Sequence, residues 1–466
     1  MRRYHVDEFG AQGDGRFDNS EALANAFHAI RDGGVLVIPT GVYRTGPLHL
    51  QGEGCTIHIE AGAHLSFIAE EERYRPVFTR WEGVDCWAMH PLLLVTDSKN
   101  ITLEGPGTLD GNGQWWWQQL AHKRAHQRGP QSAIERELAA LNPNYPIQSG
   151  GGGGRQIQFL RPPLLQVYKS SNVIIDGLTL TNSPFWTLHP LYSSHLLIKD
   201  VTIDNPSDAP NTDGIDIESC SNVVVRGCTV SVGDDGIALK SGSGKDGIAT
   251  GVPTVDVLIE DCTVARAHGG AVIGSETAAG ISNVTVRNCR FDGTDRGIRI
   301  KTRRGRGGKI QHLTFTNLTM QDNLCPLAIN MYYRCGSVDE RDFSLDALPV
   351  SETTPQIEGV RVEECRAIGS RASAAFIVGL PEAPITDLFI KDCHFGVASD
   401  TLVSTDESEM YEGLASVTER GIRIRNAHLT LEDVTVEGVE EALVVEEGAL
   451  LGAKEAVYQH SSLAEV

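Results

Sequence analysis

Acidic residues gather in two short segments of the chain, each followed by a glycine and an apolar stretch. Asp213 stands before Gly214, and the pair Asp234 and Asp235 stands before Gly236. Two carboxyl groups that flank a bond, one protonated and one ionised, are what acid-catalysed cleavage of a glycoside requires. Crowding raises the pKa of one carboxyl among several, so one can donate a proton while the others stay ionised.

A histidine and several cations follow in two further segments of the same form. His268 precedes one apolar stretch, and Arg299 and Lys301 lie in the other. Aligning the four segments on their apolar stretches pairs charged residues in three columns: Asp213 with Asp235, Asp234 with His268, and Lys240 with Lys301. If each segment is a strand of a stacked parallel sheet, column-mates lie about 4.8 Å apart. By itself Gly-Asp-Asp-Gly is typical of a turn, but the surrounding charges favour an active site.

A repeated pattern of short strands predicts the architecture. Each unit reads apolar, any residue, apolar, charged, then Asp, Asn, Gly or Glu, then an inward residue, as in Val173–Leu180 and Leu196–Ile203. Period-two alternation within short β-branched stretches indicates strands, and units this short bury a core only by stacking. The pattern predicts an all-β fold, a right-handed parallel β-helix of about ten coils; a propeller is the competing interpretation.

The rest of the chain is interpreted around this repeat as one catalytic domain, 1–466. Residues 1–50 are expected to form a cap and first coil, with a helix that begins at an N-cap Ser20, buries Leu23, Phe27 and Ile30, and covers the first strands. Residues 111–163 interrupt the repeat as an inserted loop with three adjacent tryptophans, a helix-like segment at 131–141 and five glycines at 150–154. The tryptophans are interpreted either as core or as a wall for stacking sugars. Residues 397–466 are expected to form the C-terminal coils.

Bulk properties exclude several partners and predict a compartment. The net charge of −21 argues against nucleic acid and against an anionic membrane surface. Five of the ten cysteines occupy one inward position of the repeat, so they are expected to be buried thiols: Cys228, Cys262, Cys289, Cys365 and Cys393. An N-terminus without an apolar leader indicates a cytoplasmic protein or a chain already trimmed, and the buried thiols favour the cytoplasmic location that we predict. We expect no metal and no cofactor, because there is no Cys-x-x-Cys pair and the histidines are scattered.

The four segments, together with the opening Phe9–Gly15, make the chain similar to glycoside hydrolase family 28, the polygalacturonases. The segments that carry the resemblance occur in the family order: Asn211-Thr212-Asp213, Gly233-Asp234-Asp235, His268-Gly269 and Arg299-Ile300-Lys301. Two departures, Ala267 for the first glycine of Gly-His-Gly and Gly236 where many members carry Cys, remove no catalytic side chain. The resemblance implies inverting hydrolysis of α-1,4-linked galacturonic acid in an acidic oligo- or polysaccharide.

The resemblance also implies a role for each matching residue. Asp234 is implied as the general acid, Asp213 and Asp235 as the groups that hold and deprotonate water, and His268 as a tuner of the acid. Implied substrate-binding residues are Arg299 and Lys301, which suit a sugar carboxylate, together with Tyr333. Three weaker candidates for substrate contact are His189, Trp186 and Lys240; for His189 and Trp186, structural packing is an equal alternative. Arg303, Arg304, Arg306 and Lys309 are interpreted either as added positive field or as a solvated loop.

Resemblance to bacterial exo-acting members in Ser183–Pro190 predicts attack at chain ends with release of galacturonic acid, the 111–163 insertion closing one end of the groove. Two alternatives stay open: a rhamnogalacturonan or xylogalacturonan galacturonidase of the same family, and a pectate lyase-type β-helix enzyme. The sequence leaves the oligomeric state, the minimum substrate length and tolerance of side-chain sugars undetermined.

Overall fold

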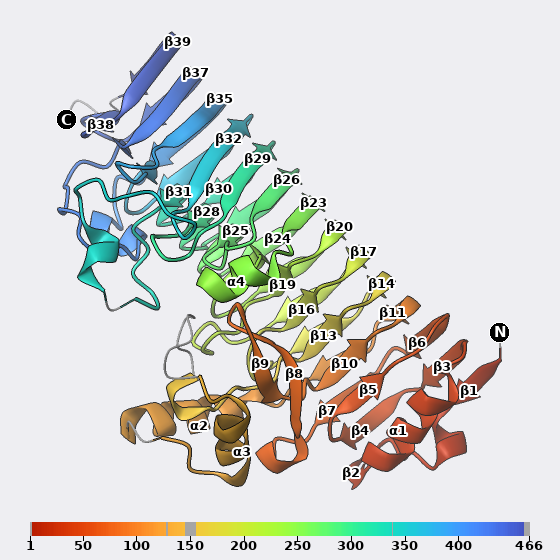
Figure 1. Ribbon diagram of the computed structural model, residues 1–466. Coiled ribbons are helices and arrows are strands. Elements are labelled where there is room, and N and C mark those ends of the chain that lie inside the picture. The colour runs from red at the N-terminus through yellow and green to blue at the C-terminus, as the bar shows by residue number, and fades with distance from the viewer. Residues whose placement is uncertain (1, 127–128, 145–154, 338, 461–466) are drawn as a thin grey trace. The chain divides into compact units, whose positions relative to one another are not determined.

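The computed structural model describes all residues except 1, 127–128, 145–154, 338 and 461–466, and its coils are built from parallel strands (Figure 1). The described residues divide into two compact units, 1–148 with 152–234 and 235–466. Each unit is a stack of right-handed parallel β-helix coils. The expected all-β parallel β-helix is confirmed.

Three strand faces form the first unit. The first face pairs β1 (Arg3–His5), β3 (Gly34–Ile38), β6 (Cys55–Ile59), β11 (Lys99–Glu104), β14 (Ser171–Asp176), β17 (Ser194–Lys199) and β20 (Ser221–Arg226). The second pairs β2 (Asp14–Asp18), β4 (Gly41–Thr45), β7 (Ala63–Phe67), β12 (Thr108–Asp110), β15 (Thr179–Thr181), β18 (Thr202–Asp204) and β21 (Thr229–Ser231). The third pairs β5 (Leu48–Leu50), β10 (Leu93–Thr96), β13 (Leu165–Tyr168), β16 (Leu188–Leu191) and β19 (Ile215–Glu218).

The second unit repeats the three faces. Its first face pairs β23 (Thr254–Glu260), β26 (Ile281–Arg287), β29 (Lys309–Thr316), β32 (Gln356–Glu363), β35 (Ile385–Val397), β37 (Ala427–Glu437) and β39 (Leu450–His460). The second pairs β24 (Thr263–Ala265), β27 (Arg290–Asp292), β30 (Thr319–Gln321) and β33 (Arg366–Ser370). The third pairs β22 (Asp235–Lys240), β25 (Gly269–Gly274), β28 (Arg296–Lys301), β31 (Cys325–Asn330), β34 (Ala375–Val378), β36 (Ile422–Arg425) and β38 (Leu443–Val445).

The Asp, Asn or Gly of the sequence repeat turns the chain between the first two faces. Asp200, Gly227 and Asn288 occupy this position, with φ of 54°, 64° and 55°. Glycine adopts this left-handed conformation freely, and Asn and Asp tolerate it better than other side chains. The next residue points inward, and all five cysteines predicted there are buried. The repeat thus encodes both the turn and the core position after it.

Four helices flank the coils among the described residues: α1 (Ser20–Ala29), α2 (Gly113–His126), α3 (Ala133–Leu141) and α4 (Gly244–Thr250). In α1, Leu23 and Phe27 are buried as expected, and Ile30 is the buried C-cap. The N-cap is Asn19, not the expected Ser20, whose hydroxyl accepts a hydrogen bond from the Gly46 N–H at 2.7 Å. The N-cap therefore lies one residue earlier than predicted, because the Ser20 hydroxyl bonds the neighbouring turn at Gly46.

The 111–163 insertion contains more helix than expected. The tryptophan run lies inside α2, and α3 confirms the helix-like segment, with a Ser132–Glu135 capping box. Trp116 is fully buried and stacks on Phe159, whereas Trp115 and Trp117 are half-buried. The core interpretation therefore holds for Trp116, and the wall for stacking sugars stays a prediction for Trp115 and Trp117. The five glycines lie outside the described residues.

A β-hairpin that the sequence repeat does not predict packs beside α3. It consists of β8 (Pro76–Trp81) and β9 (Val84–Met89), which pair antiparallel, and α3 contacts both strands. Trp81 is buried and stacks on Phe185 at 4.8 Å between ring centroids. The hairpin is thus held on the coils by a large aromatic contact.

Candidate active site

Two of the predicted catalytic carboxylates meet in the first unit. Asp213 lies just before β19, and Asp234 follows β21. Their carboxylate oxygens are within 4.8 Å of one another. Asp213 is buried and Asp234 is half-buried, so Asp234 is the more accessible of the two. The pair has the proximity that shifts protonation between neighbouring acids.

Gly233 is needed for close approach of the chain. A Cβ on Gly233 would lie 2.4 Å from the Ala209 carbonyl oxygen, so the segment before Asp213 packs directly on the segment before Asp234. The Gly233 N–H also donates to the Thr212 hydroxyl at 3.3 Å. These contacts hold the two acidic turns together.

Arg161 stabilises the turn before Asp213 through hydrogen bonds that the sequence did not predict. Its guanidinium donates to the Pro210 carbonyl at 3.0 Å and to the Asn211 side-chain oxygen at 2.9 Å. Burial lowers the pKa of Arg161 to about 9, although the nearby Asp213 and Asp234 carboxylates favour its charge. A lone arginine at the end of an insertion carries no pattern that would have marked it.

In the second unit Asp235 is fully buried between two cations. Arg299 donates to one carboxylate oxygen at 2.9 Å and Lys301 to the other at 2.5 Å. Burial alone would raise the pKa of Asp235, but Lys301, Arg299 and Lys240 outweigh it and hold that pKa far below its ordinary value. Asp235 is therefore an ionised carboxylate over the working range of pH.

Tyr333 lies against the same two cations. Its ring centroid is 5.6 Å from the Arg299 guanidinium carbon and 5.2 Å from the Lys301 ammonium, distances at which cation–π attraction operates. Met410 reaches this cluster from a segment distant in sequence, with its sulfur 3.6 Å from Arg299. The structure thus brings the predicted Arg299, Lys301 and Tyr333 together, and adds Met410.

His268 and Lys240 occupy the columns expected for them within the second unit. Asp235 pairs with Gly269, and His268 lies directly before β25 and is half-buried. Lys240 and Lys301 both align with Gly274. The Lys240 ammonium, predicted to contact substrate, lies 3.3 Å from the Glu276 carboxylate.

Glu276 is a buried carboxylate that no sequence motif predicted. Arg306 lies 3.3 Å from its second oxygen. Burial raises the pKa of Glu276, but Lys240, Arg306 and Lys301 prevail and lower it to about 2. One feature of the sequence could have indicated Glu276: it stands two residues after Gly274, the position with which Lys240 and Lys301 both align.

The cluster Arg303, Arg304 and Arg306 is buried, so a solvated loop is the wrong interpretation for these three. Arg303 lies 3.2 Å from the Asp342 carboxylate, and the Arg304 guanidinium donates two hydrogen bonds to the Glu382 carboxylate at 2.6 and 2.8 Å. Lys309 is exposed and pairs with Glu358 at 2.6 Å. The arginines anchor loops of the second unit, and their charges are matched by carboxylates.

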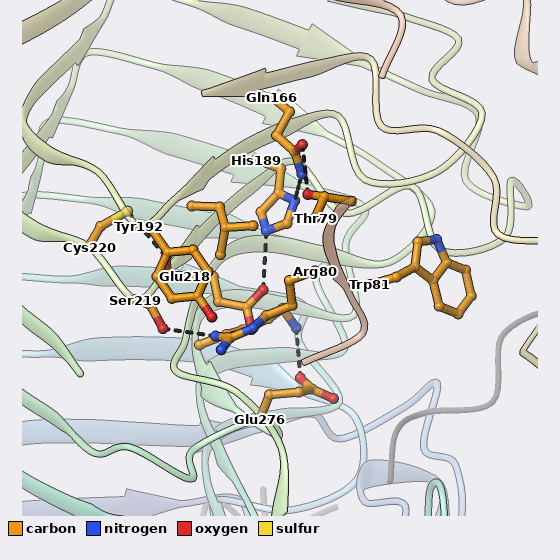
Figure 2. Close-up of polar contacts among 12 residues, drawn as sticks. Thr79, Arg80, Trp81, Gln166, His189, Tyr192, Glu218, Ser219, Cys220 and Glu276 are labelled. Atoms are coloured by element: carbon orange, nitrogen blue, oxygen red, sulfur yellow. Dashed lines mark hydrogen bonds and ion pairs between the residues drawn. The ribbon is translucent and has the colours of Figure 1, made fainter. Parts of the chain in front are cut away.

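His189 lies inside a buried polar network of the first unit (Figure 2), and the Trp186 ring packs against it. His189 bonds Gln166 at 3.0 Å through one ring nitrogen and Glu218 at 3.1 Å through the other. Only 2% of His189 and 4% of Trp186 is exposed, and the two rings meet edge to face at 4.9 Å. These contacts favour packing, the second of the two interpretations, over substrate contact.

The β8–β9 hairpin completes this network. Thr79 donates to Gln166 at 3.0 Å, and Arg80 lies 3.3 Å from Glu218 and donates to Ser219 at 2.9 Å (Figure 2). Arg80 also pairs with Asp85 at 2.8 Å, whose carboxylate accepts from Tyr192. The hairpin therefore covers the outward side chains of β13, β16 and β19.

Comparison with known proteins places this fold and site in a class. Residues 153–363 match the model of the glycosyl hydrolases family 28. A probable polygalacturonase from Vitis vinifera is 30% identical over 404 residues, which cover 84% of this chain and 74% of that protein. The chain belongs to glycoside hydrolase family 28.

Solved structures agree with this assignment. The crystal structure of an exopolygalacturonase from Thermotoga maritima is similar with a TM-score of 0.76 and 28% identity, covering 93% of this chain and 91% of that one. A polygalacturonase from Erwinia carotovora shares the fold with a TM-score of 0.61 at 18% identity, covering 99% and 96% of the two chains.

The relatives also correct one prediction. The expected cytoplasmic location is wrong, because the relatives from Vitis vinifera, Arabidopsis thaliana and Chamaecyparis obtusa are polygalacturonases, which are secreted enzymes of the cell wall. Buried thiols in a ladder are protected by packing and need no reducing compartment. Among the described residues, no helix combines the length and the apolar character that crossing a membrane requires.

Proposed function

We propose that this polygalacturonase-family hydrolase cleaves α-1,4-linked galacturonic acid with inversion, starts from the chain end and releases single galacturonic acids. Family membership establishes glycoside hydrolysis of galacturonan. The inverting course and the exo action are the proposed part.

The observation that carries the proposal is that two adjacent carboxyls have different surroundings. Arg299 and Lys301 keep Asp235 ionised, so Asp235 is unsuited to donate a proton. Asp234, the next residue along the chain, is more accessible and lies beside Asp213. We assign Asp234 as the general acid and Asp213 with Asp235 as the groups that hold and deprotonate water.

Substrate recognition is assigned to the cations around Tyr333. Arg299 offers a planar fork and Lys301 a point charge, both suited to a sugar carboxylate. The Tyr333 ring beside them fixes their side chains. His268, in the Asp234 column, is assigned to tune the acid.

Exo action is supported by the covered face of the first unit. The hairpin and its charged network cover the side chains of β13, β16 and β19 that would otherwise form a surface for a long chain. The similarity at 28% identity to an exopolygalacturonase supports the same mode of attack.

The test is a time course of products from trigalacturonic acid and from long polygalacturonate. We expect galacturonic acid alone from the first time point, with little loss of viscosity per bond cleaved. Early release of mixed oligomers would contradict exo action, and products that absorb ultraviolet light would contradict hydrolysis. Proton NMR of the first product anomer tests inversion.

A further inference from the structure

The first unit contains a cavity that the proposed catalytic residues do not use. Its volume is about 630 Å³, within the range of small-ligand sites. Helix α2 supplies one wall, and the segments around Asn182 and 206–210 supply the others. The lining residues are Gln114, Trp117, Gln118, Ala121, Asn182, Pro206, Asp208 and Pro210.

Trp117 is a fixed aromatic platform in this cavity. Its indole N–H donates to the Ser183 carbonyl at 3.0 Å. The ring lies against Gly113, where an added Cβ would come within 2.5 Å of it. A half-buried ring held by a hydrogen bond and by packing presents its face at little entropic cost. An aromatic face of this kind suits the apolar C–H face of a pyranose.

The polar groups of the cavity favour an uncharged sugar. Three amides, from Gln114, Gln118 and Asn182, offer donors and acceptors to hydroxyl groups. Asp208 accepts from hydroxyls but repels a carboxylate. No lysine or arginine is among the described residues that line the cavity. This chemistry contrasts with the paired cations of Arg299 and Lys301.

The cavity wall continues directly into the catalytic turn. Ala209 donates to the Pro206 carbonyl at 3.1 Å, and the Thr212 hydroxyl donates to the Ala209 carbonyl at 2.9 Å. Asp213 is three positions after Pro210 in the chain, so their Cα atoms are at most about 11 Å apart. A sugar in the cavity is therefore close enough to belong to the same bound oligosaccharide.

We propose that this cavity is a subsite for one neutral sugar unit of a pectic substrate, and that Trp117 determines specificity for it. The inference rests on the proposed function and narrows its substrate to galacturonan that carries neutral sugars as branches or contains them in its backbone. A branch sugar and a backbone sugar share this chemistry, so both are tested.

The experiment compares kcat/KM for three substrates of equal galacturonate content: a linear oligogalacturonate, the same oligomer carrying one xylose branch, and the same oligomer with one rhamnose in its backbone beside an intact run of α-1,4-linked galacturonate. We expect the wild type to prefer one of the two neutral-sugar substrates. Trp117→Ala should lower that preference about tenfold, mainly through KM. Ala121→Trp, which fills the cavity and keeps Trp117, should lower it similarly.

Two control variants give the result its meaning. Trp115→Ala removes a half-buried ring of the same helix that does not line the cavity, and it should keep the preference within about twofold. Arg124→Ala removes the cation one turn beyond Ala121 on the same helix face, and it should also keep the preference. If Arg124→Ala and Trp117→Ala instead lower kcat/KM for the linear oligomer by the same factor, the cavity binds galacturonate and the inference is overturned.

Equal use of all three substrates by the wild type also overturns the inference. Which substrate loses its advantage in Trp117→Ala separates a branch from a backbone sugar. Hydrolysis of the linear oligomer by the wild type tests the proposed function independently, because that substrate contains no neutral sugar. Melting temperatures of all variants show whether a lost preference reflects lost folding.

Discussion

Asp234 is the residue on which the proposed chemistry depends most. Its accessibility and its Asp213 neighbour suit a group that gains and loses a proton in each cycle. Asp235, one residue later, is locked in the ionised state by two cations. The different surroundings of these two adjacent residues are the basis for assigning them different roles.

We expect Asp234→Asn to abolish hydrolysis and to leave folding and substrate binding nearly intact, because the amide is isosteric and cannot transfer the proton. The measurement is kcat with trigalacturonic acid, with binding by calorimetry. Asp256→Asn, at an exposed position of β23, is the matched control and should keep wild-type activity. Retention of more than a few per cent of kcat by Asp234→Asn would remove it from the acid role.

Arg299 and Lys301 each support two functions, since they hold Asp235 and are assigned to the sugar carboxylate. We expect Arg299→Ala and Lys301→Ala each to lower kcat/KM by about 2–4 kcal/mol, because each removes a charge-assisted bond from a desolvated carboxylate. Arg361→Ala, which removes an ion pair near the surface, should change kcat/KM little. Equal cleavage of methyl-esterified and free-acid substrate by the wild type would show that carboxylate recognition is wrong.

At the scale of elements, loops and hairpins attached to regular coils position the site. Within the described part, the 111–163 insertion is a packed wall: Trp116 is buried, α3 contacts the hairpin, and Arg161 at its end holds the Asp213 turn. Its observed contribution to the site is therefore to hold the Asp213 turn in place, and its role as a boundary of the groove is a prediction.

Shortening the insertion within 112–154 while keeping Arg161 and the flanking strands should shift products from galacturonic acid toward mixed oligomers. The physical reason is that a wall at the end of the groove is removed while the catalytic turn keeps its brace. Product analysis by chromatography and the fall in viscosity per bond cleaved measure the change. If the shortened enzyme still releases only monomer at the wild-type rate, the β8–β9 hairpin alone must limit the groove.

Just after the end of β25, Glu276 belongs to a charge cluster whose contribution to folding stability depends on pH. The pKa of Glu276 is about 2 in the folded chain against an ordinary value of 4.5, so its stabilising effect is full above about pH 4.5 and is lost as pH falls toward 2. Glu276→Gln should lower the free energy of unfolding by about 3 kcal/mol at pH 7. Thermal melts should show this difference shrinking between pH 4.5 and 2; a constant difference would contradict the assignment.

At the scale of the whole molecule, net charge and substrate charge have the same sign. The chain carries −21 overall, yet its implied substrate is a polyanion, so attraction must come from local cations such as Arg299 and Lys301. Global charge describes non-specific partners and solubility, whereas a site responds to its local field. The composition therefore argues against nucleic acid as a partner without opposing an acidic sugar.

The sequence by itself determined the strand repeat and the register of the charged columns. Both are local: alternation of period two and a left-handed Asp, Asn or Gly at each turn are properties of a few adjacent residues. Stacking then aligns equivalent positions, which is why Asp235 falls beside Gly269 and Lys240 shares a column with Lys301.

Only the tertiary structure decided which side chains the columns would meet. His189 is buried by a hairpin about 110 residues earlier in the chain, Arg161 reaches Asn211 from the end of an insertion, and Met410 contacts Arg299 from a segment 111 residues later. These contacts join segments distant in sequence, and no periodic pattern encodes them, because their geometry depends on how insertions pack on a finished coil.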